Sequence, residues 1–124
     1  MGRLWKRYIA MREEIYTCNT CDCHLSSKSQ IISKSFHGRG GRAFLMEEVI
    51  NVYLGPNETR MLVTGMHVVA DINCIDCHTL LGWKYKEAHE ETQKYKEGHY
   101  ILEESRITFK PVVAATATVP EAQL

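Results

Sequence analysis

The amino-acid sequence predicts a mainly β fold with little helix, and three observations carry this prediction. Two Cys-x-x-Cys pairs, Cys18 with Cys21 and Cys74 with Cys77, have the spacing at which both sulfurs of a pair reach one metal ion at about 2.3 Å. Between the pairs lie 52 residues, whereas a compact zinc ribbon places its pairs about 15 to 20 residues apart. This interval holds short runs of apolar and β-branched side chains without a helical stripe, so a sheet is expected there.

Composition and charge limit the classes to which the chain can belong. Its 124 residues fit one domain, and 44% hydrophobic with 24% charged residues is ordinary for a globular protein. Fifteen basic and fifteen acidic side chains cancel, so the chain lacks the overall positive field that attracts nucleic acids. No run approaches the ~20 apolar residues of a membrane span, and no membrane partner is expected.

The sequence divides into an arm, a domain and a tail. Residues 1–14 mix basic and aromatic side chains and form an N-terminal arm, to which we assign no function. Residues 15–110 hold both cysteine pairs and the β-prone runs, and they form the folded domain. Residues 111–124 contain two prolines, small residues and Glu121 as the one charged side chain, a composition that predicts a disordered C-terminal tail.

The first half of the domain is expected to form strands. Residues 15–16 lead into the first cysteine pair, residues 31–36 are a short β-prone run, and residues 43–54 cluster apolar side chains. The sequence Gly-Pro-Asn-Glu at 55–58 predicts a turn, because proline presets φ whereas glycine and asparagine tolerate positive φ. A hairpin is expected to follow this turn.

The second half continues the β pattern. Residues 60–63 and 66–72 are apolar and β-branched, and the second of these runs leads into the second cysteine pair. Residues 80–85 alternate in character, residues 88–98 are a polar stretch suited to one or two helical turns or a loop, and residues 99–109 return to a strand pattern. Both cysteine pairs therefore fall at strand ends.

The four paired cysteines are the candidate metal ligands, and zinc is the metal that fits them. Four thiolates complete a closed tetrahedral shell that leaves no position for water or substrate, so one structural zinc ion is expected. The alternative is a redox-active dithiol. Because structural zinc supplies about 10 to 16 kcal/mol of apparent binding free energy, its loss should unfold the domain. Cys23, His24 and His78 lie beside the ligands and are interpreted as neighbours of the site.

One local basic segment interrupts the otherwise neutral chain. Residues 34–42 are rich in glycine and carry Lys34, Arg39 and Arg42, which are candidate contacts for a polyanion. The segment lacks the Gly-Lys-Ser/Thr sequence of a phosphate-binding loop. Its glycines also fit a tight structural loop, and this alternative stays open.

Trp83 and Tyr85 form the candidate ligand-binding feature. They alternate along one expected strand and therefore share a face, where Phe36 or Phe44 could complete an aromatic pocket. The alternative is a packing pair in the core. No Ser-His-Asp set, pair of acids or zinc deaminase signature occurs in the sequence, so no enzymatic activity is expected.

The whole pattern resembles the yippee family, a group of small zinc-binding eukaryotic proteins. Thirteen positions of the family pattern are matched in order, at the family's spacings, between about residues 16 and 107. They are Cys18, Cys21, Gly41, Leu45, Asn51, Gly65, Cys74, Cys77, Gly82, Trp83, Tyr85, Lys96 and Glu103. So many positions in register make the resemblance specific.

The resemblance implies a fold with known relatives. The fold would be a β-tent, in which two antiparallel sheets meet at an angle and are clipped by zinc, as in the thalidomide-binding domain of cereblon. In that domain an aromatic cage binds a cyclic imide, and Trp83 and Tyr85 are similar to two of its walls, with Val63 and Val69 or their neighbours near the other two. The related sulfoxide reductases use a cysteine on a late strand, whereas no cysteine follows Cys77 here.

Three functions follow as hypotheses. The leading one, implied by the resemblance, is a protein-interaction module of the nucleus and cytoplasm, an adaptor or subunit of a ubiquitin-ligase assembly linked to cell growth or stress. The second is a reader of a small ligand or a modified residue, with the pocket around Trp83 as its site. The third is contact with RNA or DNA through the basic segment, and the balanced charge of the chain argues against it.

Overall fold

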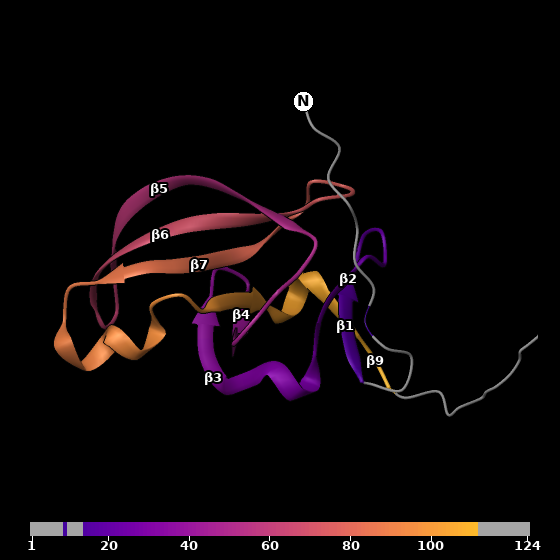
Figure 1. Ribbon diagram of the computed structural model, residues 1–124, viewed down its shortest axis with the longest axis horizontal. Coiled ribbons are helices and arrows are strands. Elements are labelled where there is room, and N and C mark those ends of the chain that lie inside the picture. The colour runs from indigo at the N-terminus through magenta and orange to yellow at the C-terminus, as the bar shows by residue number, and fades with distance from the viewer. Residues whose placement is uncertain (1–8, 10–13, 112–124) are drawn as a thin grey trace, which may run out of the picture.

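Two antiparallel β-sheets make up the protein. The computed structural model describes Ile9 and residues 14–111, and within them strands dominate while helix is limited to three short 3-10 turns. One sheet has six strands and the other has three, and the smaller sheet lies at one end of the larger (Figure 1). The expected mainly β fold of two antiparallel sheets is confirmed. No helix of this described part is long and apolar enough to cross a membrane.

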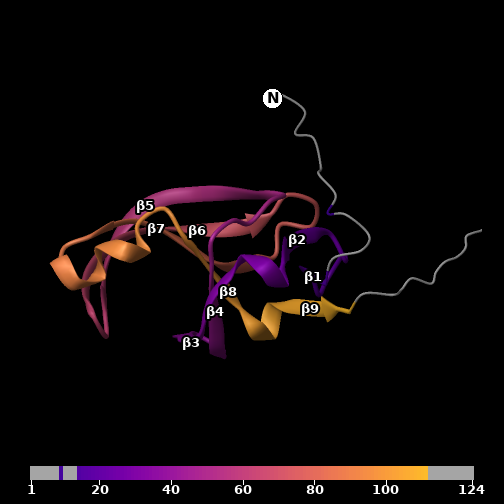
Figure 2. The same ribbon diagram turned by 60° about the horizontal axis from the view of Figure 1, so that its bottom comes forward.

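The three-stranded sheet, called the small sheet, joins the two ends of the domain. Its strands are β1 (Ile15–Cys18), β2 (His24–Ser27) and β9 (Ile107–Lys110), in the order β2-β1-β9. β1 pairs with β2 across the first cysteine pair, and with β9 from the far end of the domain, so that Tyr16 stands opposite Phe109. The first and last strands thus lie side by side (Figure 2).

The six-stranded sheet, called the large sheet, has the strand order β3-β4-β8-β7-β6-β5. All its pairings are antiparallel, and β8 lies between β4 and β7, so the strand order departs there from the order in the chain. The turn η1 connects the small sheet to β3, and η2 connects β7 to β8. These elements are η1 (Lys28–Gln30), β3 (Ile31–Gly38), β4 (Gly41–Met46), β5 (Val52–Leu62), β6 (Gly65–Cys74), β7 (Leu80–Ala88), η2 (Glu91–Lys96) and β8 (Tyr100–Glu103).

The prediction of a turn at residues 55–58 is wrong, because this segment lies inside β5. Gly55 and Pro56 together stand opposite Asp71, so the strand carries a β-bulge at the point where the turn was expected. β5 is an edge strand of the large sheet, and an edge strand accommodates proline where a central strand does not. The hairpin turn between β5 and β6 lies further on, at residues 63–64.

The strand pattern predicted over residues 99–109 is divided between the two sheets. β8 ends at Glu103, the 3-10 turn η3 (Glu104–Arg106) follows, and β9 begins at Ile107. No glycine or proline marks this boundary, so no local signal in the sequence predicts it. The run over residues 43–54 likewise belongs to two strands, β4 and β5.

Other predicted elements lie where they were expected. Residues 31–36 fall within β3, residues 66–72 within β6 and residues 80–85 within β7. The polar stretch at 88–98 contains η2, so the first of its two predicted alternatives, a short helical segment rather than a loop, is the one that forms. Apart from Ile9, Glu14 and Pro111, the predicted N-terminal arm and disordered tail lie outside the described residues.

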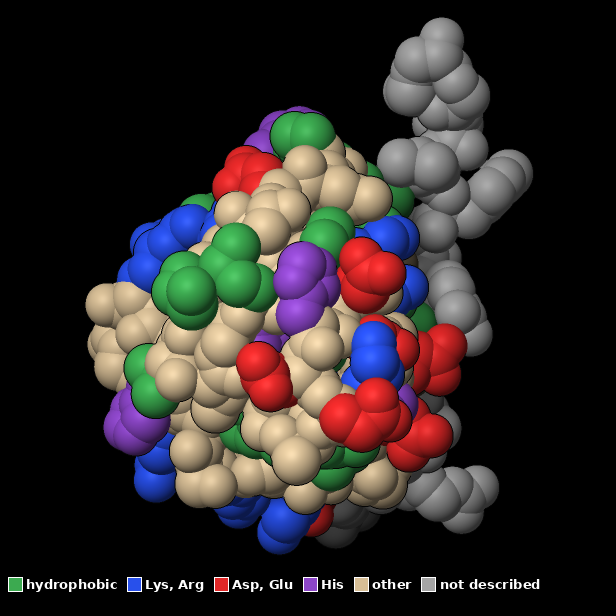
Figure 3. Space-filling model, turned by 90° about the vertical axis from the view of Figure 1, so that its left-hand side faces the viewer, with side chains coloured by type: hydrophobic (Ala, Val, Ile, Leu, Met, Phe, Trp, Pro, Cys, Tyr) green, Lys and Arg blue, Asp and Glu red, His purple; other side chains and the backbone are tan. Residues whose placement is uncertain are grey.

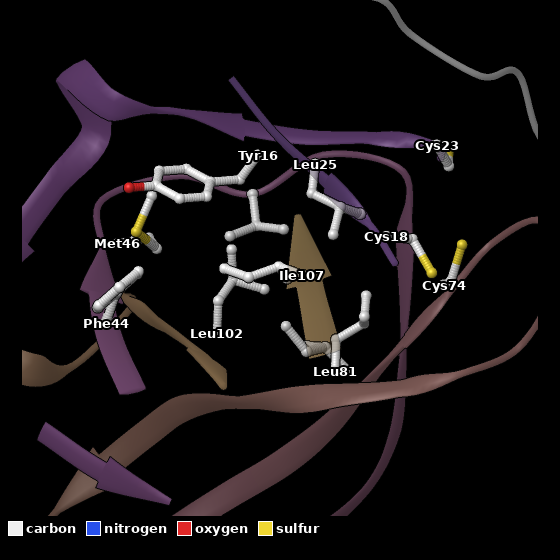
Figure 4. Close-up of a cluster of buried hydrophobic side chains, with 12 residues drawn as sticks. Tyr16, Cys18, Cys23, Leu25, Phe44, Met46, Cys74, Leu81, Leu102 and Ile107 are labelled. Atoms are coloured by element: carbon white, nitrogen blue, oxygen red, sulfur yellow. The ribbon is translucent and has the colours of Figure 1, made fainter. Parts of the chain in front are cut away.

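Two hydrophobic clusters lie on opposite faces of the large sheet. Successive residues of β4 alternate between them, as the pleat of a strand requires. The first cluster packs between the sheets, where Figure 4 shows side chains of the small sheet against Phe44, Met46, Leu81 and Leu102 of the large sheet. The second cluster holds Ala43, Leu45, Val69, Trp83, Tyr85 and Ile101.

Candidate functional site

The two cysteine pairs meet where the small sheet joins the large one. Cys18 is the last residue of β1 and Cys74 the last residue of β6, while Cys21 and Cys77 lie in the turns that follow (Figure 4 shows Cys18 beside Cys74). The four Sγ atoms all lie within 4.8 Å of one another. The Sγ atoms of Cys18 and Cys77 are 3.5 Å apart, as are those of Cys21 and Cys74. The shortest contacts therefore join one pair to the other.

Both cysteine turns have the same backbone geometry. In each, the residue after the second cysteine donates its N–H to the carbonyl oxygen of the first cysteine, over 2.7 Å for Asp22 and 2.9 Å for His78. Both residues have a φ of 67°, in the left-handed region where aspartate and histidine are enriched among residues other than glycine. This conformation turns the chain tightly enough to direct both sulfurs of a pair to one point.

The sulfur cluster fits one tetrahedral zinc ion. Sulfurs at about 2.3 Å from a central zinc stand roughly 3.8 Å apart, and the 3.5 Å contacts and the 4.8 Å limit bracket this value. Burial raises the pKa of Cys21 and of Cys74, so binding there must displace protons. Burial also raises the pKa of Cys77, but hydrogen bonds with Thr79 and the neighbouring thiols lower it to about 7. Cys77 is therefore the most readily deprotonated of these three ligands.

Asn51 connects the two cysteine turns from the loop between β4 and β5. Its side-chain N–H donates over 2.7 Å to the carbonyl oxygen of His24, beside the first turn. Its own carbonyl oxygen accepts the N–H of Ile75, within the second turn, over 2.9 Å. Asn51 is buried with a φ of 60°, which asparagine tolerates better than most residues. The geometry of the ligands thus depends on a residue outside both pairs.

The other neighbours of the ligands are engaged elsewhere. Cys23 is buried, its Sγ lies 3.9 Å from the carbonyl oxygen of His24, and it is not part of the sulfur cluster. His24 Nδ1 accepts the N–H of Ile9 over 3.0 Å. His78 Nδ1 shares a hydrogen bond of 2.9 Å with the hydroxyl of Tyr53. These contacts agree with their interpretation as neighbours of the site.

A cavity of about 650 Å³ opens beside the second hydrophobic cluster. Phe36 of β3, Val69 of β6, and Trp83 and Tyr85 of β7 line it, together with the β5–β6 turn and part of η2. The rings of Trp83 and Tyr85 are 6.2 Å apart and inclined at 82°. The Nε1–H of Trp83 is buried and makes no hydrogen bond within the described residues. The cavity thus has aromatic walls, and the indole N–H lies buried beside them.

A buried lysine lines the same cavity. Lys96 of η2 is only 3% exposed, and its Nζ donates to Oγ1 of Thr64 over 2.9 Å. The same Nζ lies 5.2 Å from the ring centre of Phe36 and 5.3 Å from that of Tyr85, which are cation–π distances. Burial lowers the pKa of Lys96 and raises the pKa of Tyr85. The amine therefore lies between two aromatic rings.

Comparison with known families assigns the chain. Residues 14–120 match the family model described as "Yippee zinc-binding/DNA-binding /Mis18, centromere assembly". The chain belongs to the yippee family. A yippee-like protein of Solanum tuberosum is 49% identical over 108 residues, covering 87% of this chain and 82% of the relative. Yippee-like 3 of Oryzias latipes is 50% identical over 106 residues (86% and 89%), and yippee-like 4 of Homo sapiens 49% over 105 residues (85% and 83%).

The yippee fold also matches a solved structure. A crystal structure of the Mis18 "Yippee-like" domain superposes with a TM-score of 0.63, over 79% of this chain and 95% of that domain. The two sequences are 12% identical, so this likeness concerns the fold alone. The zinc-binding description of the family and the clustered thiols together identify one zinc ion as the cofactor, with ligands Cys18, Cys21, Cys74 and Cys77.

The predicted aromatic residues of this yippee chain separate into two places. Phe44 lies apart from the cavity, in the cluster between the sheets, with its ring 5.7 Å from that of Tyr16. Trp83 and Tyr85 are 7% and 2% exposed, so they pack in the core and also form walls of the cavity. Trp83 and Tyr85 are therefore both a packing pair of the core and part of the wall of an aromatic pocket. The structure brings together at the cavity Phe36, Val63, Val69, Trp83 and Tyr85.

The three basic candidates of the glycine-rich segment are also separated. Arg39 lines the aromatic cavity and lies 4.0 Å from a carboxylate oxygen of Asp71. Lys34 and Arg42 line a second cavity of about 410 Å³, where Arg42 pairs with Glu104 over 3.0 Å. The segment comprises the end of β3, the turn at residues 39–40 and the start of β4. Both arginines thus face acids, which reduces their availability to a polyanion.

Two residues of the site were missed as functional residues by sequence reasoning. Asn51 and Lys96 were recognised only as positions of the yippee pattern, without a role. Lys96 belongs to a polar stretch that is typical of a solvent-exposed segment, and it is buried by tertiary contacts of η2 with β7, Phe36 and Thr64. Membership of the family pattern was the one signal that could have singled out either residue.

Proposed function

We propose that this yippee protein is a non-catalytic protein-interaction module built on a structural zinc ion. The observation that carries the proposal is the apolar tip, defined as Met61, Val63 and Tyr95, at the β5–β6 hairpin and η2. Val63 is fully exposed, Met61 is 72% exposed and Tyr95 is 57% exposed. Figure 3 shows this end of the molecule, where apolar side chains stand among charged ones.

The apolar tip adjoins a hollow in the surface. Val63 and Tyr95 also line the aromatic cavity, so exposed apolar surface continues into the cavity beside it. Protein interfaces concentrate binding energy in aromatic and apolar side chains that fill pockets. An exposed hydrophobic surface on a folded domain is also typical of an interaction site. A protein partner that inserts an apolar side chain beside Val63 fits this arrangement.

The finer part of the proposal concerns the partner. We place the protein in a ubiquitin-ligase assembly as an adaptor or subunit, in the nucleus and cytoplasm, with a role linked to cell growth or stress. Its resemblance to the family supports this role. The closed shell of four thiolates supports a role in binding, because it leaves the zinc ion no open position for a substrate.

Quantitative affinity purification with mass spectrometry tests the proposal. The tagged protein is expressed in dividing eukaryotic cells as wild type, as Val63→Asp and as Ile32→Asp. Ile32 is 44% exposed on β3 and serves as the control for an exposed apolar residue outside the tip. We expect Val63→Asp to lose a stoichiometric partner that Ile32→Asp retains, with equal zinc content in all three proteins.

Two outcomes count against the proposal. Retention of every partner by Val63→Asp would contradict the role of the apolar tip. If the partner that Val63→Asp loses belongs to a complex without any ubiquitin-ligase subunit, only the proposed role in a ubiquitin-ligase assembly would be contradicted.

The cavity favours a second function, the binding of a small ligand or a modified side chain. Its volume of about 650 Å³ lies within the range of roughly 300 to 1,000 Å³ that is typical of ligand sites. In a Trp5→Phe background, Trp83 is the only tryptophan, so its fluorescence reports on the wall of the cavity. We expect a saturable change of this fluorescence with at least one member of a fragment library. A library without any such member would contradict this function.

A further inference from the structure

The surroundings of Lys96 leave its charge without a counterion. Its ammonium group has three donors, and Oγ1 of Thr64 is the one acceptor that it contacts within the described residues. No carboxylate of those residues lies within the 4.0 Å of an ion pair with Lys96. A buried charge without a partner is costly, and an anion bound beside it relieves that cost.

The other cations of the cavity are already paired. Arg60 contacts Asp71 over 3.0 Å and Glu58 over 2.8 Å, and Arg39 lies 4.0 Å from the same Asp71. No aspartate or glutamate of the part of the chain that the structure describes lines the cavity. Among the described residues that line the cavity, Lys96 is therefore the lysine or arginine without a carboxylate within 4.0 Å.

The position of Lys96 also disfavours one class of ligand, the cations. Aromatic cages bind methylated ammonium groups through the faces of their rings. Here the Lys96 amine stands 5.2 Å from the ring centre of Phe36 and 5.3 Å from that of Tyr85, so it already occupies the space that such a guest would need. A second cation at this place would meet a like charge. The cavity therefore disfavours a cationic guest.

We propose that the cavity binds an apolar molecule through a single carboxylate, with Lys96 as the anchor of that carboxylate. Leu62, Val69 and the ring of Trp83, which line the cavity, receive the apolar part of the ligand. One unpaired cation matches one negative charge, which favours a carboxylate over a phosphate dianion. This inference rests on the second of the two proposed functions, since it names the ligand class of that site.

Titration of the full-length, zinc-loaded, ¹⁵N-labelled protein followed by NMR tests the ligand class. The probes are N-acetyl-phenylalanine and its primary amide, which differ only in the carboxylate, and phenyltrimethylammonium as the cation. We expect the acid to shift the indole resonance of Trp83 and to bind at least tenfold more tightly than the amide. We expect no saturable binding of the cation.

A peptide pair distinguishes the two sources of a carboxylate. The peptide Ala-Ala-Ala-Ala-Phe is titrated with a free and with an amidated C-terminus. Tighter binding of the free peptide than of N-acetyl-phenylalanine indicates the C-terminus of a protein chain as the source. The reverse order indicates a free carboxylic acid.

Variants place the carboxylate at Lys96. Lys96→Met keeps the length of the side chain and removes the charge, and it should weaken the acid at least tenfold while leaving the amide unchanged. Lys86→Met is the matched control, because Lys86 is an exposed lysine of β7 that does not line the cavity, and its affinities should equal those of wild type. If Lys96→Met does not fold, the ratio of the affinities of the wild-type protein for the acid and for the amide tests the proposed carboxylate site without the variant.

Three results would overturn the inference. Equal affinities for acid and amide, or a preference for phenyltrimethylammonium, would exclude a carboxylate as the recognised group while keeping the cavity as a ligand site. Failure of every probe to bind at millimolar concentration would also overturn it. The Val63→Asp purification tests the role of the apolar tip independently of these titrations. Failure of the proposed protein interaction can therefore be distinguished from failure of the proposed carboxylate site.

Discussion

At the scale of single residues, buried polar side chains join parts of the chain that are distant in sequence. Asn51 contacts the segments of both cysteine turns, and Lys96 connects η2 to Thr64 and to the rings of two strands. Neither residue carries a local sequence pattern that indicates its partners. Their roles follow from the tertiary structure, which is why sequence reasoning did not assign them.

Substitution of Asn51 should weaken the zinc centre through its scaffold. Asn51→Ala removes the amide N–H that donates to the carbonyl oxygen of His24 and places alanine at a φ of 60°. We expect the free energy of unfolding to fall by about 2 to 4 kcal/mol. Asn57→Ala, at an exposed position of β5, should change it by less than about 0.5 kcal/mol. Urea unfolding of the zinc-loaded proteins measures both, and equal effects would contradict the prediction.

Lys96 should make stability depend on pH on the alkaline side. Burial lowers its pKa below the ordinary 10.5, so between the folded-state pKa and 10.5 the unfolded chain holds more protons than the native chain. The contribution of Lys96 to the free energy of unfolding therefore increases as the pH rises through this interval. This increase is lost as the pH falls through the folded-state pKa. The buried Tyr16 and Tyr85, whose pKa values are raised, contribute the opposite slope in all variants, so urea unfolding at several pH values should show a more positive slope in wild type and in Lys86→Met than in Lys96→Met. A common slope would refute the prediction.

At the scale of elements, strands β7 and β8 approach each other closely at Gly82. A Cβ built on Gly82 would overlap the carbonyl oxygen of Ile101 in the paired strand. Gly55 in β5 differs, because a Cβ there would lie 3.8 Å from its nearest neighbour, a carbonyl oxygen of Asp71. The glycine beside Trp83 is thus required by backbone contact, whereas the one in the bulge is not.

This pair of glycines gives a matched test. Gly82→Ala should lower the free energy of unfolding by about 3 kcal/mol or more, because the strands must separate to admit the methyl group. Gly55→Ala meets only ordinary van der Waals contact and should be tolerated within about 1 kcal/mol. Thermal unfolding of both variants checks this. A stable Gly82→Ala with unchanged backbone resonances in β8 would contradict the predicted contact.

Element types were easier to predict from the sequence than element limits. Residues 66–72 and 80–85 have the apolar and alternating patterns of strands, and they form strands. The chemistry of residues 55–58 fits a turn and a bulge equally well, and only the strand pairing decides between them. The division of residues 99–109 between two sheets depends on contacts with strands far away in the chain, which no local pattern records.

At the scale of the whole molecule, the zinc centre is a cross-link between two sheets that the chain otherwise joins through η1 and η3. One cysteine pair follows β1 of the small sheet and the other follows β6 of the large sheet. The Cys-x-x-Cys spacing is local, so sequence reasoning could identify all four ligands. The cavity could be predicted only in part, since the choice of Phe36 over Phe44 depends on which face each side chain occupies.

Removal of zinc should therefore unfold the protein. The binding free energy of structural zinc, about 10 to 16 kcal/mol, is comparable to the whole stability of an ordinary domain, about 5 to 15 kcal/mol. We expect one zinc ion per chain in wild type and in Cys23→Ser, because Cys23 lies outside the sulfur cluster. Cys74→Ser should lose the metal and its near-ultraviolet circular dichroism. Elemental analysis and spectroscopy measure this, and a zinc content near zero in freshly purified wild type would sink the prediction.

The bulge in β5 has a consequence for association between molecules. β5 runs from Val52 to Leu62 at the outer edge of the large sheet, and a long edge strand presents unpaired backbone groups to which a strand of another molecule can add. Pro56 has no N–H to offer, and the bulge breaks the regular spacing of the remaining donors near the middle of the strand. The residue that resembles a turn signal in the sequence thus opposes aggregation through the free edge of the sheet.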